Sequence, residues 1–276
     1  MFELPEFLTL ADQFNQAVQG KMVHEGRLGN SPHKFVWYNR QPAEFARLTQ
    51  GKTVGETSVK GRWLLVRLEP GYVLVLGECG GKVLLHPLGE ETPEKYHLFL
   101  GFEDGTTLTV LTQMWGAMEL FEAGQEQERQ YIKDMRTTPV DPGFTHDYFS
   151  AFVDELGQGE KRSVKSLLTQ DQLIPGLGNA IAQDIMFRAG LHPKHPITAL
   201  DAKQKERLFH AITLTVQNVA EEGGRYDETD LFGNPGGYLR LMDSKSAGQP
   251  CRVCGTTIQK IQYLGGACYF CPTCQI

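Results

Sequence analysis

The stretch Arg162 to Pro193, RSVKSLLTQDQLIPGLGNAIAQDIMFRAGLHP, decides the fold of the C-terminal half of the chain. Apolar residues recur at helical spacing on both sides of the loop 175–179. They are Val164, Leu167 and Leu168 before the loop, and Ile181, Ile185, Met186 and Ala189 after it. This spacing predicts two short helices, each with one apolar face, joined by a glycine-rich turn.

The turn between these helices has the residues of an anion site. Gly176 and Gly178 would allow backbone conformations that other residues resist, and Asn179 is predicted to cap the second helix. A glycine loop at the start of a helix presents unpaired N–H groups, which suit a phosphate. Arg162 and Lys165 lie on the approach. On these residues alone, the stretch could equally be a helical hairpin whose glycines only shape the turn.

Length and composition describe an ordinary globular protein. A chain of 276 residues predicts about two domains, and its 41% hydrophobic and 22% charged residues are typical values. No apolar run is long enough to cross a bilayer. The start, MFELPEFLTLADQF, lacks the basic region of a signal peptide. We therefore expect a cytoplasmic protein without a membrane partner, and most simply a monomer.

Charge is unevenly distributed along the chain. The net charge is −6, which does not favour nucleic acid in general. Residues 160–200, however, carry five lysines and arginines against three acids, and residues 245–276 carry three basic residues and no acid. Any contact with nucleic acid should therefore be local to these segments and only modestly salt-dependent.

The N-terminal half alternates strand-like segments with turns. Residues 5–20 predict a helix with Leu8, Ala11, Phe14 and Val18 on its buried side. Strands are predicted at residues 34–39, 57–68, 71–77, 96–102, 106–112 and 117–121. The expected fold class is α+β: an N-terminal β-sandwich with a leading helix over 1–138, a helical domain over 144–244 and a cysteine-bearing tail over 245–276.

The tail carries the strongest metal signal. Cys251 and Cys254 form one CxxC pair, Cys271 and Cys274 form another, and sixteen residues separate the pairs. Four thiolates at this spacing predict a tetrahedral zinc site with a structural role. Disulfides are the alternative, but a reducing compartment disfavours them. Cys268 is expected to be a spare thiol.

The chain resembles the formamidopyrimidine-DNA glycosylase and endonuclease VIII family along essentially its whole length. The matches include Lys165-Ser-Leu-Leu, Gly176-Leu-Gly178-Asn179 and Phe187-Arg-Ala-Gly190-Leu-His192-Pro193. The resemblance implies a helix-two-turn-helix domain, a zinc β-hairpin and a double-stranded DNA partner. It also implies that Lys165 and Asn179 hold phosphates beside the damaged nucleotide.

The resemblance is incomplete at the N-terminus, where the family has its catalytic residues. Members of the family begin Met-Pro-Glu-Leu-Pro-Glu, and the resemblance implies that the proline amine attacks the sugar C1′ to form a Schiff base. Here Phe2 replaces the proline, so the terminal amine belongs to Met1. Glu3 and Glu6 are either first-turn acids that favour the helix dipole or a surviving pair for acid–base hydrolysis through water.

Other expected site residues differ as well. Arg62 stands where the family has a catalytic lysine; it can hold a phosphate but will not lose a proton. Lys60, two residues earlier and predicted on the same strand face, is a conceivable substitute amine. Glu78 replaces a methionine that fills the vacated base position. Met114 and Trp115 could wedge between DNA bases or fill the core, and we expect the core.

Two further positions bear on DNA binding. The tip of the zinc hairpin carries an arginine in the family, and Gly266 occupies this position here. The acidic, glycine-rich loop 223–237 lies where the family caps the extruded base, and its acids would suit a positively polarised partner.

Three functions remain open from the sequence. The first is a divergent DNA-repair protein that binds damaged or abasic double-stranded DNA and has lost the proline-dependent lyase chemistry. The second is an active glycosylase that uses Glu3 with water or with an amine of Met1 or Lys60. The third is a non-enzymatic adaptor for RNA or protein, which the acidic balance, Glu78 and Gly266 favour.

Overall fold

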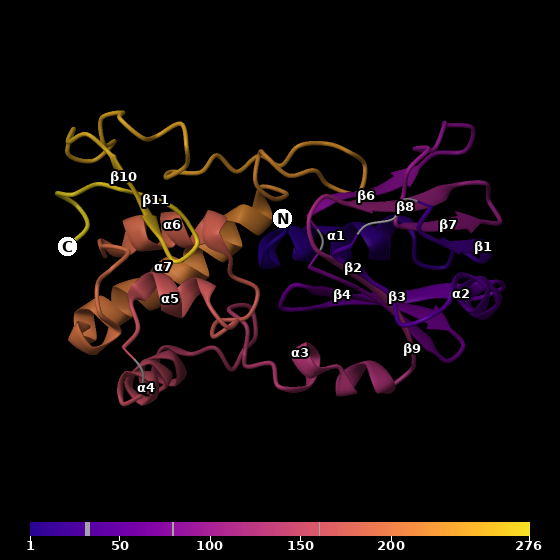
Figure 1. Ribbon diagram of the computed structural model, residues 1–276, viewed down its shortest axis with the longest axis horizontal. Coiled ribbons are helices and arrows are strands. Elements are labelled where there is room, and N and C mark those ends of the chain that lie inside the picture. The colour runs from indigo at the N-terminus through magenta and orange to yellow at the C-terminus, as the bar shows by residue number, and fades with distance from the viewer. Residues whose placement is uncertain (31–33, 79, 160) are drawn as a thin grey trace. The chain divides into compact units, whose positions relative to one another are not determined.

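The computed structural model describes residues 1–30, 34–78, 80–159 and 161–276. These residues group into two units (Figure 1). The first contains Met1–Met135 and Val219–Tyr238, and the second contains Arg136–Asn218 and Leu239–Ile276. The acidic loop thus groups with the N-terminal unit rather than with the helices that precede it.

The first unit is the predicted α+β sandwich. One sheet has the order β1 (Val23–Leu28), β7 (Leu98–Phe102), β8 (Thr107–Thr112) and β6 (Gly81–His86). The other has the order β2 (Val36–Trp37), β9 (Gly116–Glu122), β5 (Tyr72–Gly77), β4 (Trp63–Glu69) and β3 (Thr53–Lys60). Neighbouring strands are antiparallel, except that β2 runs parallel to β9. The helices of this unit include α1 (Leu4–Ala17), α2 (Pro42–Thr49) and α3 (Gln130–Lys133).

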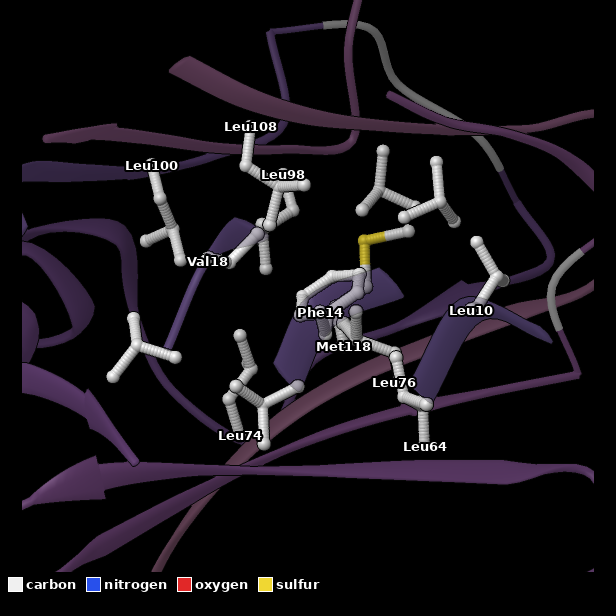
Figure 2. Packing of buried hydrophobic residues seen from close by; sticks show 14 of the residues in the cluster. Leu10, Phe14, Val18, Leu64, Leu74, Leu76, Leu98, Leu100, Leu108 and Met118 are labelled. Carbon is white, nitrogen blue, oxygen red and sulfur yellow. The ribbon is translucent and has the colours of Figure 1, made fainter. Parts of the chain in front are cut away.

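The core of this unit lies between the two sheets, and α1 contributes to it (Figure 2). Phe14 and Val18 pack with Leu74 and Met118 of one sheet and Leu98 of the other. The buried face of α1 includes Phe7 and Leu10, so Leu8, predicted on this face, is only half-buried. Burial of such side chains stabilises each by about 1.5–3 kcal/mol.

The single strand predicted over residues 57–68 is in fact a hairpin of β3 and β4. Lys60 pairs with Trp63 at its end, and Gly61 adopts a φ of +59° in the turn. This left-handed conformation suits glycine, and it reverses the chain. Lys60 and Arg62 therefore do not follow the alternation of one strand, and the prediction of a shared strand face was wrong.

The second unit contains the two predicted helices, α5 (Val164–Thr169) and α6 (Asn179–Ala189), with α4 (His146–Gly157) and most of α7 (Ala202–Glu221). The apolar residues that predicted α5 and α6 are all buried. Gly178, not Asn179, is the N-cap of α6, so Asn179 is the first helical residue. A two-stranded hairpin, β10 (Gln259–Tyr263) and β11 (Gly266–Phe270), precedes the C-terminus.

Buried polar side chains of α6 hydrogen-bond to the backbone of the C-terminal segment 239–276. Asp184, fully buried, accepts the backbone N–H groups of Leu241 and Met242 at 2.9 and 2.8 Å. Gln183 accepts the Tyr269 N–H at 2.8 Å. Because these partners satisfy the buried carboxylate and amide, the hairpin has a fixed position against α6. Among the residues that the structure describes, no helix is long and apolar enough to span a membrane.

Candidate nucleic-acid interface and N-terminal site

The first turn of α1 binds a buried arginine through its acids. Glu3 is the N-cap of α1, and its N–H donates to Glu6 Oε2 at 2.8 Å in a capping box. Arg225, from the acidic loop, donates to Glu6 Oε1 through its backbone N–H at 3.1 Å and its Nε at 2.9 Å. Its Nη1 lies 3.8 Å from Glu3 Oε1. Glu3 and Glu6 therefore act here as counter-ions of Arg225.

Arg225 is held as a cation at this position. Its side chain is only 3% exposed. Burial on its own would lower the pKa of Arg225, but the charges of Glu6 and Glu3 outweigh burial and raise the pKa above its ordinary value. Removing one partner of a buried ion pair of this kind destabilises the folded protein by roughly 3–5 kcal/mol, because the other charge stays buried without a counter-ion.

The terminal amine is part of the same ion cluster. The Met1 amine donates to Glu228 Oε1 at 2.6 Å, and the Met1 carbonyl accepts Arg225 Nη2 at 2.8 Å. A side chain on Gly80 would meet Met1 Cα at 2.8 Å, so the Met1 backbone lies close against Gly80. An amine attacks a sugar carbon through its lone pair; in this geometry the Met1 amine is a hydrogen-bond donor to a carboxylate.

Phe2, which stands where the resemblance led us to expect a proline, belongs to the core. Its side chain is fully buried and packs edge-to-face on Phe7, with ring centroids 5.9 Å apart. The residue that would present a reactive amine is therefore a hydrophobic anchor of α1.

The two basic residues of the β3–β4 turn have separate partners. Arg62 Nη2 lies 3.0 Å from Glu78 Oε1, and Arg62 Nη1 donates to Met1 Sδ at 3.5 Å. Lys60 Nζ instead donates to Gln127 Oε1 at 3.1 Å. Arg62 thus lies beside Met1 and offsets the charge of Glu78, whereas Lys60 points to a different neighbour.

Met114 and Trp115 are surface residues, so our expectation that they fill the core was wrong. Their exposed fractions are 59% and 40%. They lie in the turn between β8 and β9, and the alternation that buries strand residues ends before them.

In the second unit, Lys165 and Asn179 both contact the β-hairpin. Lys165 is 1% exposed, and its Nζ donates to the Tyr263 carbonyl at 2.5 Å. Asn179 is exposed, and its Nδ2 lies 3.5 Å from the Ala267 carbonyl. A Cβ on Gly266 would be 3.3 Å from Asn179 Oδ1. The helix-two-turn-helix and the hairpin tip therefore meet at these two residues.

Arg162 is the third cation of this region. Its Nη1 forms an ion pair with Asp171 Oδ2 at 3.1 Å, and its side chain is 16% exposed. A cavity of about 360 Å³ lies alongside, with Lys161, Arg162 and Lys194 among its lining residues. Basic side chains thus gather around the start of α5, as expected from the sequence.

The four predicted metal ligands are brought together. All four Sγ atoms of Cys251, Cys254, Cys271 and Cys274 lie within 4.8 Å of one another. Cys254 and Cys271 are 3.4 Å apart, and Cys251 and Cys274 are 3.9 Å apart. Zinc–sulfur bonds of about 2.3 Å in a tetrahedron imply sulfur separations of roughly 3.8 Å, so this set fits zinc. Cys268 is buried outside the cluster.

Known sequence families match both halves of the chain. The N-terminal domain of formamidopyrimidine-DNA glycosylase matches residues 1–138, and the H2TH domain of the same enzyme matches residues 138–229. The chain belongs to the formamidopyrimidine-DNA glycosylase family. The formamidopyrimidine-DNA glycosylase of Listeria innocua is 30% identical over 281 residues, covering 100% of both chains. That of Bacillus licheniformis is 30% identical over 279 residues, covering 100% of this chain and 99% of the relative.

Solved structures of the family share the fold. The MutM (Fpg) protein from Thermus thermophilus superposes with a TM-score of 0.82 at 26% identity, covering 99% of this chain and 98% of that chain. The Lactococcus lactis Fpg in complex with DNA containing an abasic site gives a TM-score of 0.87 at 23% identity, covering 99% of both chains.

The main residues of the N-terminal site in this member of the family were not predicted from the sequence. Arg225 and Glu228 were missed as partners of Glu6 and Met1, because they lie more than two hundred residues away in the sequence. The one available signal was a single arginine among the acids of loop 223–237. Two acids of this loop, assigned from the sequence to an outside partner, bind within the protein instead: Glu228 binds Met1, and Asp230 binds Gln13 and Asn234.

Proposed function

We propose that this protein binds double-stranded DNA at damaged or abasic nucleotides and does not perform amine-dependent lyase chemistry. Family membership and the structure of a Lactococcus lactis relative with abasic-site DNA support the DNA partner. A vacated nucleotide needs no unstacking, so it is the least costly target for a protein of this fold. The observation that carries the loss of chemistry is the Met1 amine, hydrogen-bonded to Glu228 at 2.6 Å.

Lys165 and Asn179 are proposed to bind the phosphates next to the target nucleotide, with Gly178 at the N-cap beside them. The Lys165 ammonium can donate three hydrogen bonds, and the Tyr263 carbonyl accepts one of them. Asn179 is exposed at the first turn of α6, where the helix dipole favours an anion. Gly266 brings no cation to this site, so these residues bear more of the binding than an arginine-tipped hairpin would require.

Zinc is proposed as the structural cofactor of the tail. Four cysteine thiolates would complete its coordination and leave no position for substrate, so the metal would stabilise the hairpin rather than react. The predicted cytoplasmic location goes with this proposal, because a reducing compartment keeps the cysteines available as thiolates.

The alternative of a water-based glycosylase has less support. It needs a carboxyl group of Glu3 or Glu6 that is free to exchange a proton. Both Glu6 oxygens accept hydrogen bonds, one from the Glu3 N–H and the other from Arg225. The adaptor alternative loses part of its support, since Arg62 offsets the charge of Glu78.

Lys165→Gln and Asn179→Ala are each expected to weaken binding to an abasic duplex by about tenfold or more, because each removes a hydrogen bond to a charged phosphate. Fluorescence anisotropy at two salt concentrations measures this, with an otherwise identical intact duplex and an RNA hairpin as competitors. Because Asn179 is exposed, Asn179→Ala tests the site without the risk of misfolding that comes with substituting the buried Lys165.

The matched control for this experiment is Lys203→Gln, an exposed lysine of α7 in the same unit. Its affinity for the abasic duplex should stay within about twofold of that of the unaltered protein, because a single surface charge away from the site has a small effect. Equal affinity for intact and abasic duplexes, or tighter binding of the RNA, would overturn the proposal.

Phe2→Pro is expected to destabilise the protein without creating a lyase. Loss of the buried ring costs about 3–5 kcal/mol, and cleavage of the initiator methionine before proline would also remove the pair of Met1 and Glu228. Thermal unfolding and strand cleavage of an abasic duplex provide the measurements, with Phe2→Leu as the apolar control. A stable Phe2→Pro protein that cleaves the strand would show that the site is still competent.

A further inference from the structure

The cavity beside α5 is lined mainly by cations and hydroxyl groups. Its volume is about 360 Å³, and its lining includes the cations Lys161, Arg162 and Lys194, the hydroxyl residues Ser163 and Thr198, and Tyr263. The described residues that line it do not include Lys165 or Asn179. The cavity is therefore separate from the pair of residues proposed to bind the duplex phosphates.

This cavity has an excess of positive charge. Arg162 forms an ion pair with Asp171 at 3.1 Å, whereas Lys161 and Lys194 take part in no ion pair between described residues. Both lysines are exposed, and Lys194 Nζ lies 5.4 Å from the centroid of the Tyr263 ring. Asp171 thus offsets one of the three positive charges and leaves two.

The backbone around the cavity is fixed by its own hydrogen bonds. Ser163 and Pro196 form an antiparallel bridge, and the Ile197 N–H donates to the Arg162 carbonyl at 3.0 Å. These contacts join the segment before α5 to the segment that follows α6, and both segments carry lining residues. Because this backbone is ordered before a ligand arrives, binding costs less conformational entropy.

Cations and hydroxyl donors around a small cavity suit a phosphate group that carries two negative charges. Lysine and arginine bind phosphate through charge-assisted hydrogen bonds, and each hydroxyl can donate another. A phosphodiester of a nucleic-acid backbone carries one negative charge, whereas a phosphomonoester carries about −1.5 to −2 at pH 7. The two remaining positive charges of the cavity therefore match a phosphomonoester better than a phosphodiester.

We propose that this cavity binds a phosphomonoester or pyrophosphate group, a ligand distinct from the duplex phosphates assigned to Lys165 and Asn179. Two sources supply such a group: a free nucleotide, and the terminal phosphate of a broken DNA strand. Tyr263 connects the two sites, since it lines the cavity and its carbonyl accepts Lys165 Nζ at 2.5 Å. The cavity would bind its ligand whether or not the protein prefers damaged DNA.

Isothermal titration calorimetry of the full-length protein with inorganic pyrophosphate tests this site. Lys194→Gln should weaken the binding of pyrophosphate by about tenfold, because it removes a charge-assisted hydrogen bond. Lys194→Arg keeps the cation and should retain most of the affinity. Lys194 is exposed, so neither change threatens the fold. Lys203→Gln, the exposed control in α7, should bind pyrophosphate as the unaltered protein does.

Two nicked duplexes of one sequence, with either a 5′-phosphate or a 5′-hydroxyl at the nick, identify the source of the group. If the source is a strand end, the phosphate-bearing nick should bind more tightly, and pyrophosphate should abolish this difference. If the source is a free nucleotide, the two nicks should bind equally, and adenosine monophosphate should bind in calorimetry with an affinity that falls in Lys194→Gln. Either result supports the cavity as a phosphate site.

Two results would overturn the proposal. One is a protein that does not bind pyrophosphate, or binds it equally well with and without Lys194→Gln. The other is binding that is lost in Lys165→Gln but unchanged in Lys194→Gln, which would place the anion at the duplex site. Asn179→Ala separates this proposal from the proposed function, because it should weaken binding of the abasic duplex and leave the affinity for pyrophosphate unchanged.

Discussion

Arg225→Met is expected to lower the free energy of unfolding of the N-terminal unit by about 3–5 kcal/mol, because it leaves buried carboxylates without a counter-ion. Glu6 and Glu3 are each 4% exposed, and Glu228 Oε1 lies 3.3 Å from Arg225 Nη2. Methionine fills a similar space, so the loss is electrostatic rather than a cavity. Urea unfolding followed by circular dichroism measures it.

The pH dependence of this effect has a definite sign. In the variant, the buried carboxylates take up protons more readily than in the unfolded chain, since burial without a counter-ion disfavours the charged form. The destabilisation should therefore be complete well above the ordinary glutamate pKa of about 4.3 and should shrink as the pH falls towards it.

Two comparison variants isolate the charge effect. Arg27→Met removes an exposed arginine paired with Glu25 and should cost less than about 1 kcal/mol. Glu6→Gln combined with Arg225→Met should recover part of the stability, because one uncompensated charge is removed. A loss at Arg225 no larger than that at Arg27 would contradict the assignment of a structural ion cluster.

Removal of the metal is expected to have the second large effect. The small apolar cluster under the hairpin consists of Met242, Cys251, Ile258, Tyr269 and Cys271, so two of its five residues are predicted ligands. Zinc binding contributes about 10–16 kcal/mol to folding in isolated zinc-finger peptides. A chelator, or Cys254→Ser with Cys271→Ser, should therefore unfold residues 245–276.

Metal content and limited proteolysis test this expectation together. The unaltered protein should contain about one zinc per chain by mass spectrometry, and chelation should expose the tail to protease. Cys268→Ala changes a buried thiol outside the cluster and should retain the metal. A metal-free protein with a protease-resistant tail would contradict the zinc assignment.

Prediction from sequence succeeded where local pattern and spacing determine structure. The apolar spacing of α5 and α6 depends on residues within one or two turns. The spacing of the CxxC pairs indicates by itself that their sulfur atoms lie close together. The strands β1 and β6 were missed. In β1, VHEGRL, charged residues occupy the exposed positions and only Val23, Gly26 and Leu28 are buried, so its apolar pattern is weak.

The ion cluster at the N-terminus could not be predicted, because its residues are far apart in the sequence. Arg225 reaches Glu6 across 219 positions in the sequence, and nothing near either residue indicates the pair. The stacking of Trp37 on Trp115 likewise arises from a two-residue parallel pairing of β2 with β9. Met114 and Trp115 are exposed because they lie in the turn between β8 and β9. Their apolar character led us to expect buried side chains.

Borohydride trapping on an abasic duplex is the most direct measurement of the central claim. The protein is expected to bind this duplex in preference to an intact one and to form no covalent adduct under reduction, because the Met1 amine is bound to Glu228 and Phe2 occupies the core. A trapped adduct that is lost in Glu3→Gln would show that a relocated amine performs the chemistry, and the account of a binding protein without lyase activity would be wrong.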